Sequence, residues 1–448
     1  MVSALSVHSL RSVVTIHSTM FGKVYHRRHI ERRTTSPNWS DLRSEILELI
    51  MKNLSFLDML RFKSVCSSWN QAMKCYYATS FPQTSPWLML PSDQENVHND
   101  ISTRCFYSLK EDEVYTVKNV LQECHDDWCV GSSHGWLVIM DNNAVPHLLN
   151  PVSRRRIQLP KIWSLQNCTS NPDSIEQLRM TFICKAVLSS DPSCNGNFVV
   201  AIIYGVLSSK LGFCKYGEEG SRWRGLEGVH GEYCDVIFHK EKLYALAGDG
   251  SVEVWRDFNN SSTPIKTMNL HQPYLELENV NHIIKDFSKD KYSTQTYLVE
   301  SLGEILSVGR VIGNFVNHEG TAILEGDLDE YGYFCPYRTL QFYVLKLNFT
   351  ANKWEKVESL RGQALFLGGN QSMSLSTPDF LECEENSIYF TDDRWDEINF
   401  DAGSVDDNRY GGHDVGIYNI GNKVVKPIYQ FEKWRVDPPP FWIVPNPW

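Results

Sequence analysis

The sequence lacks the features that mark several large classes of protein. No run of about 18 or more apolar residues is present, so no segment has the length of a membrane-spanning helix. Walker phosphate-binding loops, H-E-x-x-H zinc motifs and G-x-G-x-x-G dinucleotide fingerprints are also absent. These absences argue against the commonest nucleotide-dependent and zinc-dependent enzymes. We expect a protein without catalytic residues, without a cofactor and without a role in a membrane.

The 12 cysteines form no C-x-x-C pair and have no regular spacing. The closest pair, Cys124 and Cys129 in "CHDDWC", has no matching second half for a zinc site. His134, His239 and His413 lie near expected turns, where a surface or turn-stabilising role is commoner than metal ligation. We therefore expect reduced thiols, as in a reducing compartment, and no metal centre.

Acidic residues outnumber basic ones outside the first 37 residues. Residues 1–37 hold six lysines and arginines and one acid, whereas the remaining chain has a net charge of −16. Binding of DNA or RNA needs lysine and arginine to neutralise phosphates, so an acidic body argues against nucleic acid as the partner. We expect a protein partner instead.

The basic segment 1–37 carries several serines and arginines. This composition is typical of an organelle transit peptide or of a disordered tail, and "HRRHIERR" also matches a short nuclear address. We expect a disordered tail on a protein of the nucleus and cytoplasm. Import into an organelle is the alternative.

Residues 40–77 are the one strongly helical stretch of the sequence. Apolar residues recur there at spacings of three and four, which lays a stripe along one face of each helix. They are Leu42, Ile46, Leu47, Ile50 and Leu54 in a first helix, and Phe62, Val65, Cys66 and Trp69 in a second. Ser40 and Asp41 suit the start of the first helix, and "SFLD" at 55–58 has the pattern of a capping box. A two-helix hairpin has too few apolar positions to enclose a core, so we expect a partner to cover it.

From about residue 86 the sequence is typical of β-strands. Short apolar runs alternate with turn residues, and similar units have their turns near residues 135, 196, 242, 302 and 386. Spacings of about 45 to 85 residues fit four-stranded propeller blades with insertions. With one further unit before the first turn, the fold class we predict is mainly β: a helical hairpin followed by a β-propeller of about six blades. A pair of β-sandwiches is the alternative.

Two acidic insertions interrupt the strands, "VNHEGTAILEGDLDEYGY" from 316 and "DDRWDEINFDAGSVDDNRYGGHD" from 392. Their carboxylates do not follow the D-x-D-x-D-G order of a calcium loop. They are either solvated loops or protein-binding loops on one face of the propeller.

The stretch 39–69, "WSDLRSEILELIMKNLSFLDMLRFKSVCSSW", resembles an F-box. This resemblance implies binding to a Skp-type adaptor, which joins a cullin–RING ubiquitin ligase. The adaptor-binding positions that it implies are Leu42, Ile46, Leu47, Ile50, Leu54, Asp58, Leu60, Val65 and Trp69. Arg61 and Cys66 also match the pattern.

The strands resemble the plant KIB-type β-propeller that follows such F-boxes. The matching stretches are "GSSHGWLV", "NPVSRRRIQLP", "VIFHKEKLYAL", "LVESLGEIL" and "NSIYFTDD". The resemblance implies that the propeller recruits an unknown protein target for ubiquitylation. The expected domains are a tail at 1–37, an F-box at 38–78, a propeller at 79–438 and a Pro/Trp-rich tail at 439–448.

Arg43 departs from the F-box pattern, which usually has proline after Leu42. Proline pre-sets the first helical turn and offers an apolar face, whereas arginine loses both. We expect a weaker affinity for the adaptor. Two other interpretations stay open: a non-catalytic propeller module outside any ligase, and an organellar propeller protein.

Overall fold

The chain has two units in the computed structural model, a helical unit and a β unit, which are described separately. The residues that the structure describes are 39–80, 85–91, 103–117, 127–165, 175–194, 196–205, 209–229, 231–258, 264–270, 292–316, 337–394, 411–429, 431, 436 and 439–448. The tail 1–37, Cys124 and most of both acidic insertions lie outside these residues.

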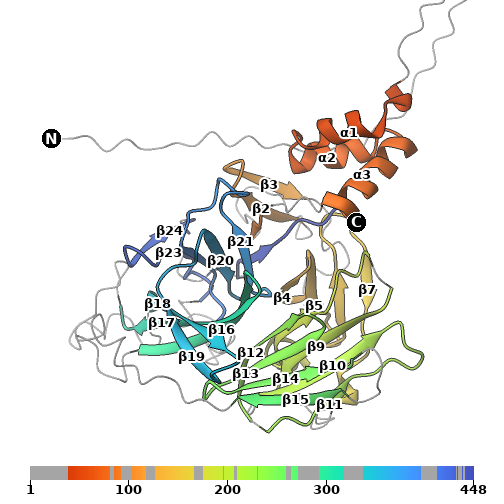
Figure 1. The fold of residues 1–448 in the computed structure, drawn as a ribbon. Coiled ribbons are helices and arrows are strands. Elements are labelled where there is room, and N and C mark those ends of the chain that lie inside the picture. The colour runs from red at the N-terminus through yellow and green to blue at the C-terminus, as the bar shows by residue number, and fades with distance from the viewer. Residues whose placement is uncertain are drawn as a thin grey trace, which may run out of the picture. The chain divides into compact units, whose positions relative to one another are not determined.

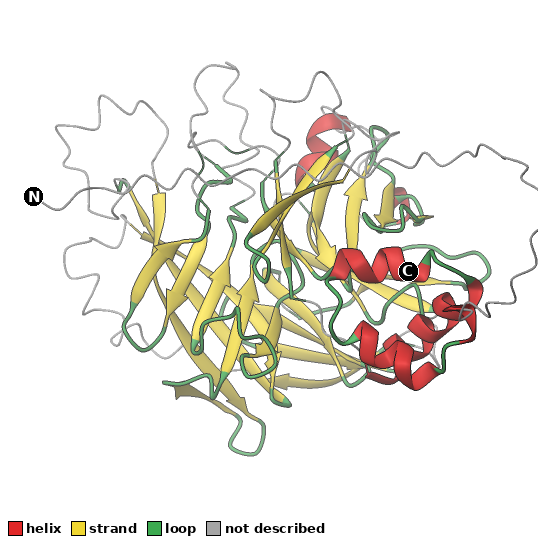
Figure 2. Cartoon of the chain, turned by 90° about the horizontal axis from the view of Figure 1, so that it is seen from above, coloured by secondary structure: helices red, strands yellow, loops and turns green. Residues whose placement is uncertain are grey.

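The helical unit contains three α-helices and a short 3-10 turn rather than the two helices that the apolar spacing predicts (Figure 2). These elements are η1 (Trp39–Asp41), α1 (Ser44–Met51), α2 (Phe56–Lys63) and α3 (Ser67–Ser80). The predicted second helix is interrupted because the N–H of Val65 donates to the carbonyl of Phe62, three residues back, at 3.1 Å. Such a tightened last turn ends a helix, and α3 then packs against both α1 and α2.

The helix starts are partly as predicted. Ser55 is confirmed as the N-cap of α2, since its Oγ accepts a hydrogen bond from the N–H of Asp58 at 3.1 Å. The first helix begins later than predicted, because Ser40 and Asp41 already belong to the 3-10 turn. Arg43 is the N-cap of α1, and its side chain makes no capping hydrogen bond. The boundary predicted after residue 78 falls inside α3.

Helices are few in the rest of the described chain, as predicted. They are η2 (Ile162–Ser164) and α4 (Ile175–Thr181). Within the described residues, no helix combines the length and apolarity needed to cross a membrane.

The β unit is a propeller of six sheets arranged in a ring (Figure 1), which confirms the prediction of about six blades. The first three sheets contain β1 (Trp87–Leu90), β2 (Arg104–Ser108) and β3 (Glu113–Val117); β4 (Trp128–Ser133), β5 (Trp136–Met140), β6 (Pro146–Leu149) and β7 (Arg156–Gln158); and β8 (Ile183–Leu188), β9 (Phe198–Tyr204), β10 (Lys210–Tyr216) and β11 (Arg224–Leu226).

The other three sheets follow in chain order. They contain β12 (Tyr233–His239), β13 (Lys242–Ala247), β14 (Val252–Arg256) and β15 (Ile265–Leu270); β16 (Tyr292–Ser301), β17 (Glu304–Asn314), β18 (Tyr337–Asn348) and β19 (Lys353–Val357); and β20 (Gln363–Leu367), β21 (Met373–Ser376), β22 (Ser387–Phe390), β23 (Gly416–Asn419) and β24 (Val424–Pro427). The sixth sheet is irregular because β20 pairs with β22 in parallel.

The last strand, β25 (Phe441–Ile443), closes the ring by pairing antiparallel with β1. This finding corrects the predicted boundary at 438, since the Pro/Trp-rich segment 439–448 supplies a strand of the first sheet. Proline is tolerated on both sides of this short strand because its three residues alone make the ladder. Trp442 is fully buried.

Neighbouring sheets share apolar cores. Five clusters of buried side chains among the described residues each combine residues of two adjacent blades, as in the pairs Leu148 and Val200, Val187 and Val236, Val254 and Leu298, Phe342 and Phe390, and Phe366 and Trp442. Strands that bury both faces account for the long apolar runs in the sequence.

Segment 368–372, which follows β20, reaches the first strands of other blades. The ammonium of Lys185 on β8 donates hydrogen bonds to the carbonyls of Gly368 at 2.9 Å and Asn370 at 2.8 Å. The N–H of Gln371 donates to the carbonyl of Ser132 on β4 at 2.7 Å. Because β4 and β8 are the first strands of their blades, the segment contacts several blades at once.

Candidate functional site

The helical unit exposes apolar side chains that an isolated protein would normally bury. On α1, Ile46 is 45% exposed and Leu49 is 61% exposed, and their spacing of three places them on one face of the helix. Val65, between α2 and α3, is 57% exposed, and Trp39 is 65% exposed. Ile46 and Leu49 thus form an exposed apolar patch on α1, and exposed apolar patches are typical of protein-binding surfaces when they are large enough.

The predicted adaptor-binding residues divide into exposed, half-buried and buried positions. Ile46 and Val65 are exposed, whereas Leu47 is only 1% exposed and is therefore a packing residue. The half-buried positions are Leu42, Ile50, Leu54, Asp58, Leu60 and Trp69.

Asp58 and Trp69 make contacts within the helical unit. The Asp58 carboxylate accepts hydrogen bonds from Arg61 at 2.7 Å and from the Ser55 hydroxyl at 3.0 Å, and these bonds lower its pKa. The Trp69 indole donates to the Trp39 carbonyl at 2.9 Å. Both residues therefore stabilise the local fold of the unit.

Sequence reasoning missed Trp39 and Leu49 as exposed apolar positions. The signal for Leu49 was present, because it lies three residues after Ile46 on the same helical face. Trp39 precedes the apolar stripe, and the spacing of the stripe gives no indication of its exposure.

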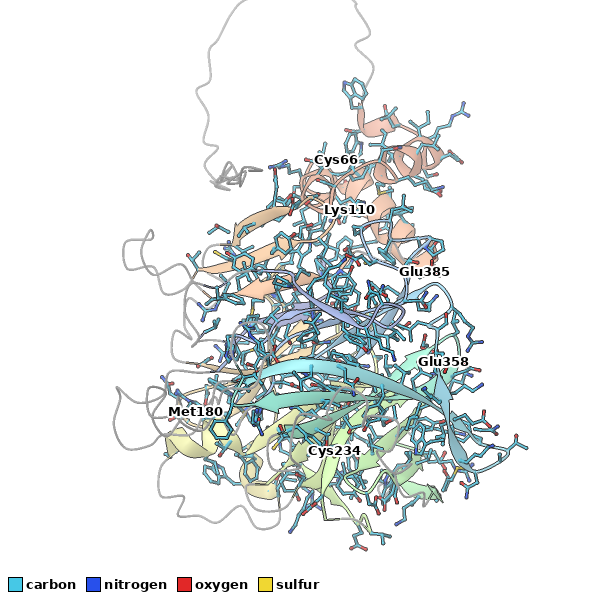
Figure 3. All side chains as sticks on the ribbon, turned by 90° about the vertical axis from the view of Figure 1, so that its left-hand side faces the viewer. Cys66, Lys110, Met180, Cys234, Glu358 and Glu385 are labelled. Atoms are coloured by element: carbon cyan, nitrogen blue, oxygen red, sulfur yellow. The ribbon has the colours of Figure 1, made fainter. Side chains whose placement is uncertain are left out.

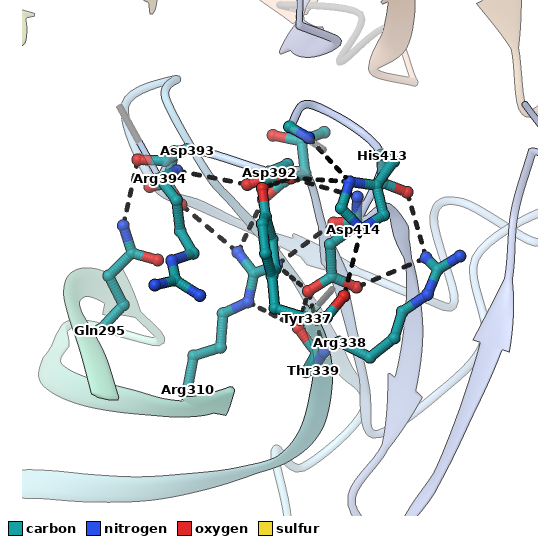
Figure 4. A network of polar contacts seen from close by, with 12 residues as sticks. Gln295, Arg310, Tyr337, Arg338, Thr339, Asp392, Asp393, Arg394, His413 and Asp414 are labelled. Atoms are coloured by element: carbon teal, nitrogen blue, oxygen red, sulfur yellow. Dashed lines mark hydrogen bonds and ion pairs between the residues drawn. The ribbon is translucent and has the colours of Figure 1, made fainter. Parts of the chain in front are cut away.

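The propeller holds a buried ionic network at Arg310 of β17, which is 0% exposed (Figure 4). The Arg310 guanidinium donates to Asp414 Oδ2 at 2.8 Å, to Asp393 Oδ1 at 3.3 Å and to the Thr391 carbonyl at 2.8 Å. Asp414 Oδ2 also accepts from the N–H of Thr339 at 2.8 Å. Fully hydrogen-bonded pairing of this kind is what makes a buried charge tolerable.

The network joins the described ends of the two acidic insertions. Tyr337, where the chain returns from the first insertion, donates its hydroxyl proton to Asp392 at 2.6 Å. Arg394, before the second insertion, donates to Asn314 at 3.0 Å and stacks over the Tyr337 ring at 4.4 Å. The described residues that flank the two insertions therefore lie side by side.

Burial and charge pull the pKa values of these carboxyl groups in opposite directions. Burial raises the pKa of Asp393, with Arg310 and Lys185 opposing it. At Asp414 burial also favours the neutral acid, but Arg310 and Arg338 together lower the pKa below its usual value. Asp414 is thus the ionised partner of Arg310.

A small polar cavity of about 120 Å³ lies beside this network. Its lining residues are Cys184, Lys185, Cys234, Gln295, Thr296, Tyr297, Gly369 and Asp393. They come from the first strands of three blades and from the segments that follow β20 and β22, so the cavity lies where several blades meet.

The stretch Gly131–Gly135, "GSSHG", has the G-x-S-x-G order of a hydrolase nucleophile elbow, which sequence reasoning overlooked. An elbow needs a turn from a strand to a helix with an exposed serine. Here the turn joins two strands, β4 and β5, and Ser133 is 2% exposed with its hydroxyl bonded to Gln371. The motif is therefore structural. Among the described residues, no group of three or more histidine, cysteine or acidic side chains is arranged to hold a metal ion.

Comparison with known proteins gives the class of the chain. A model of the KIB1-4 beta-propeller family matches residues 106–419, and a model of the F-box domain matches residues 39–75. The chain therefore belongs to the KIB1-4 β-propeller family and is a plant F-box protein with a KIB-type propeller. An F-box joined to a propeller is the general arrangement of a substrate receptor of a ubiquitin ligase, an adaptor-type rather than a catalytic protein.

Its curated relatives are proteins of Arabidopsis thaliana. The chain is 26% identical over 401 residues to the F-box/kelch-repeat protein KIB1, which covers 89% of this chain and 85% of that protein. It is 26% identical over 392 residues to the F-box protein KIB2, covering 86% of this chain and 78% of that protein. It is 23% identical over 433 residues to the F-box protein SKIP23, and the match covers 91% of this chain and 95% of that protein.

His413, in the ionic network, makes the stability of the propeller depend on pH. Its Nδ1 accepts from the N–H of Gly411 at 3.1 Å and its Nε2 lies 3.1 Å from the Tyr337 carbonyl, so the buried ring is neutral. Burial lowers the pKa of His413 below its usual value near 6.5, although Asp392 and Asp414 oppose the shift. Between these two pKa values the unfolded chain binds a proton that the folded chain does not, so stability falls with falling pH.

We expect His413→Gln to reduce this pH dependence. The free energy of unfolding of the wild type should fall by up to about 1.4 kcal/mol per pH unit below pH 6.5 because of this residue alone. Denaturant unfolding at pH 7.0, 6.0 and 5.0 measures the slope, and His239→Gln, on a less buried ring, is the matched control. If the free energy of unfolding changes with pH equally in wild type and His413→Gln, His413 is not the source of the pH dependence.

Proposed function

We propose that this chain is the substrate-receptor subunit of a Skp–cullin–F-box ubiquitin ligase. In this proposal the helical unit binds a Skp-type adaptor, and through it a cullin, while the propeller recruits a protein target for ubiquitylation. The observation that carries the proposal is the set of exposed apolar side chains, Trp39, Ile46, Leu49 and Val65, on a unit with the F-box pattern. Covering such side chains stabilises a complex by about 25 cal/mol per Å² of apolar area removed from water.

The properties of the two units suit the two roles that this proposal gives them. The helical unit has its own buried side chains, among them Met51, Phe62 and Met73, so it can hold its exposed residues in place for a partner. The propeller is a ring stabilised by shared cores, which is the kind of rigid scaffold on which binding loops are commonly carried. A propeller module outside any ligase is the second candidate, and the adaptor experiment separates the two.

The exposed face of α1 provides the first test. Replacing Ile46 and Leu49 together by alanine removes apolar area that the adaptor would cover, so the affinity for a purified Skp-type adaptor should fall at least about tenfold. Isothermal titration with the full chain measures the affinity. Both residues are exposed, so the variant should unfold at the temperature of the wild type.

The matched control for this test is Leu381→Ala. Leu381 is 88% exposed on the propeller and lies between β21 and β22, so its truncation is the same chemical change away from the F-box. Adaptor affinity should be unchanged. If wild type and the Ile46/Leu49 variant bind the adaptor equally, the proposed function fails.

Arg43 provides the second test. Its φ of −65° is the value that a proline ring imposes, so the native backbone at this position suits proline. Arg43→Pro should stabilise the helical unit by about 0.4–1 kcal/mol, mainly by restricting the unfolded chain, and should raise adaptor affinity. Arg43→Ala is the control, since it removes the charge without fixing φ. If wild type and Arg43→Pro bind the adaptor with equal affinity, arginine at this position does not weaken adaptor binding.

We further propose that the protein acts in the nucleus and cytoplasm. The support is the basic cluster within residues 1–37 and the absence of cysteine pairing in the sequence. A fluorescent fusion of the full chain should show both compartments, and a fusion of residues 1–37 alone should not enter chloroplasts or mitochondria. Import of the short fusion into either organelle would favour the organellar alternative.

A further inference from the structure

Segment 444–448, the strap, follows β25 and is held by side chains rather than by a strand ladder. The ladder between β25 and β1 has three residue pairs and ends at Ile443. Pro445 and Pro447 have no N–H groups that could extend it. Pro445 and Asn446 are nevertheless buried, so other contacts hold the strap in place.

Asn446 joins the strap to two other blades. Its Nδ2 donates to Asp191 Oδ2, in the β8–β9 turn of the third sheet, at 2.8 Å, and to the His134 carbonyl, in the β4–β5 turn of the second sheet, at 3.3 Å. Its Oδ1 accepts from the N–H of Trp448 at 3.0 Å. Because both ends of the amide have partners, the orientation of the side chain is fixed.

The second and third sheets also present donors to the backbone of the strap. Asn150, between β6 and β7, donates from Nδ2 to the Trp448 carbonyl at 2.7 Å and to the Asn446 carbonyl at 3.1 Å. The Ser193 hydroxyl donates to the Trp448 carbonyl at 2.9 Å. The strap therefore lies on a polar surface built by turns of two blades.

The ladder between β1 and β25 is a seam in the ring. β1 ends at Leu90 and β25 begins at Phe441, so no hairpin turn joins the two strands. Three residue pairs also give this ladder fewer hydrogen bonds than the seven pairs give β9 and β10. Lys110, in the β2–β3 turn, marks the first sheet in Figure 3, and Glu385, before β22, marks the sixth.

Packing beside the seam is incomplete. A small apolar cavity of about 10 Å³ lies between Trp87 and Phe106 of the first sheet, Pro151 and Val152 of the second, and Pro445 of the strap. Side chains that line a void lose dispersion contacts there. The polar contacts of the strap therefore contribute more to closure at this seam than they would beside a filled core.

We propose that the strap is a lock on the ring: it keeps the seam between β1 and β25 closed, and its release opens the ring there while the other blades stay folded. β25 continues directly into the strap, so a strap bonded to the second and third sheets also holds β25 against β1. The Ser132 hydroxyl of β4 adds a hydrogen bond to the Trp442 carbonyl of β25. Folded proteins commonly open locally at their least stable element. The inference concerns the propeller itself and goes beyond the proposed function.

Asn446→Asp tests the lock. One carboxylate oxygen still accepts from the N–H of Trp448, but the other replaces a donor and faces the Asp191 carboxylate, so the strap should detach. The amides of β1 and β25 should then exchange with deuterium at least about tenfold faster than in the wild type, while those of β9 and β13 keep their rates. Hydrogen–deuterium exchange of the full chain, read by mass spectrometry, measures both.

The matched control is Asn348→Asp, at the end of β18 in the fifth sheet. Asn348 Nδ2 donates to Glu355 at 3.0 Å, and its Oδ1 accepts from the N–H of Ala351 at 2.9 Å. The substitution therefore also places a carboxylate against a carboxylate while keeping the second acceptor. Exchange at β1 and β25 should be unchanged in this variant.

Exchanging the two groups should restore the lock. When Asn446→Asp is combined with Asp191→Asn, the amide that replaces Asp191 can donate to the carboxylate that replaces Asn446. Its oxygen still accepts from the Trp136 indole and from the N–H of Ser193, as in the wild type. Exchange at β1 and β25 should return to within about threefold of the wild-type rate, because the pair again has one donor and one acceptor.

A variant on the receiving surface covers the case in which Asn446→Asp does not fold. Asn150→Asp keeps an oxygen for the N–H groups of Val152 and Ser153 but removes both donor bonds to the strap. It should accelerate exchange at β1 and β25 alone. Equal acceleration in every blade, no acceleration in either single variant, or no recovery in the double variant would overturn the proposal.

Discussion

The propeller depends on one strand pairing between residues about 350 positions apart. β25 joins the inner edge of β1, and through Trp442 it completes the apolar core that the sixth and first blades share. Each blade buries its faces against its two neighbours, so an open ring would leave two blades half covered. The cavity and the ionic network lie between blades, and their geometry is therefore fixed only when the ring is closed.

Buried charge is the second constraint on the ring. Lys185 and Arg310 project from strands whose other residues are largely apolar, and each is matched by carboxylates and backbone carbonyls of another blade. Removing one member of such a group leaves a buried charge uncompensated, which typically costs about 3–5 kcal/mol. The polar contacts thus tie Lys185 and Arg310 to particular residues of other blades.

The parts of the fold that depend on neighbouring residues could be predicted from the sequence. The contacts between residues far apart in the chain could not. The Ser55 capping box, the blade turns and the exposure of Ile46 and Val65 follow from residue type and spacing within a few positions. The three-helix arrangement was missed because a tight turn at residues 64–66 needs no glycine or proline. The pairing of β25 was missed because its partner strand is at the other end of the domain.

The candidate sites, too, could be predicted only where they depend on neighbouring residues. F-box positions could be assigned from a short pattern, but whether Leu47 is exposed or buried depends on tertiary packing. Arg310 had one visible signal, a lone arginine in the apolar run "LSVGRVIG", yet nothing in the sequence places Asp393 and Asp414 beside it. Residues of different blades come together only in the folded ring, so their spacing in the sequence does not predict their contacts.

Segment 368–372 has a consequence for how the propeller can change over evolutionary time. Because segment 368–372 is bonded to the first strands of several blades, a change in this segment is felt by more than one blade at once. Gly131 shows how tightly the axis is filled, since a methyl group there would lie 2.0 Å from the Gly369 carbonyl oxygen. Substitutions along these first strands are therefore limited by the backbone of another blade as well as by their own sheet.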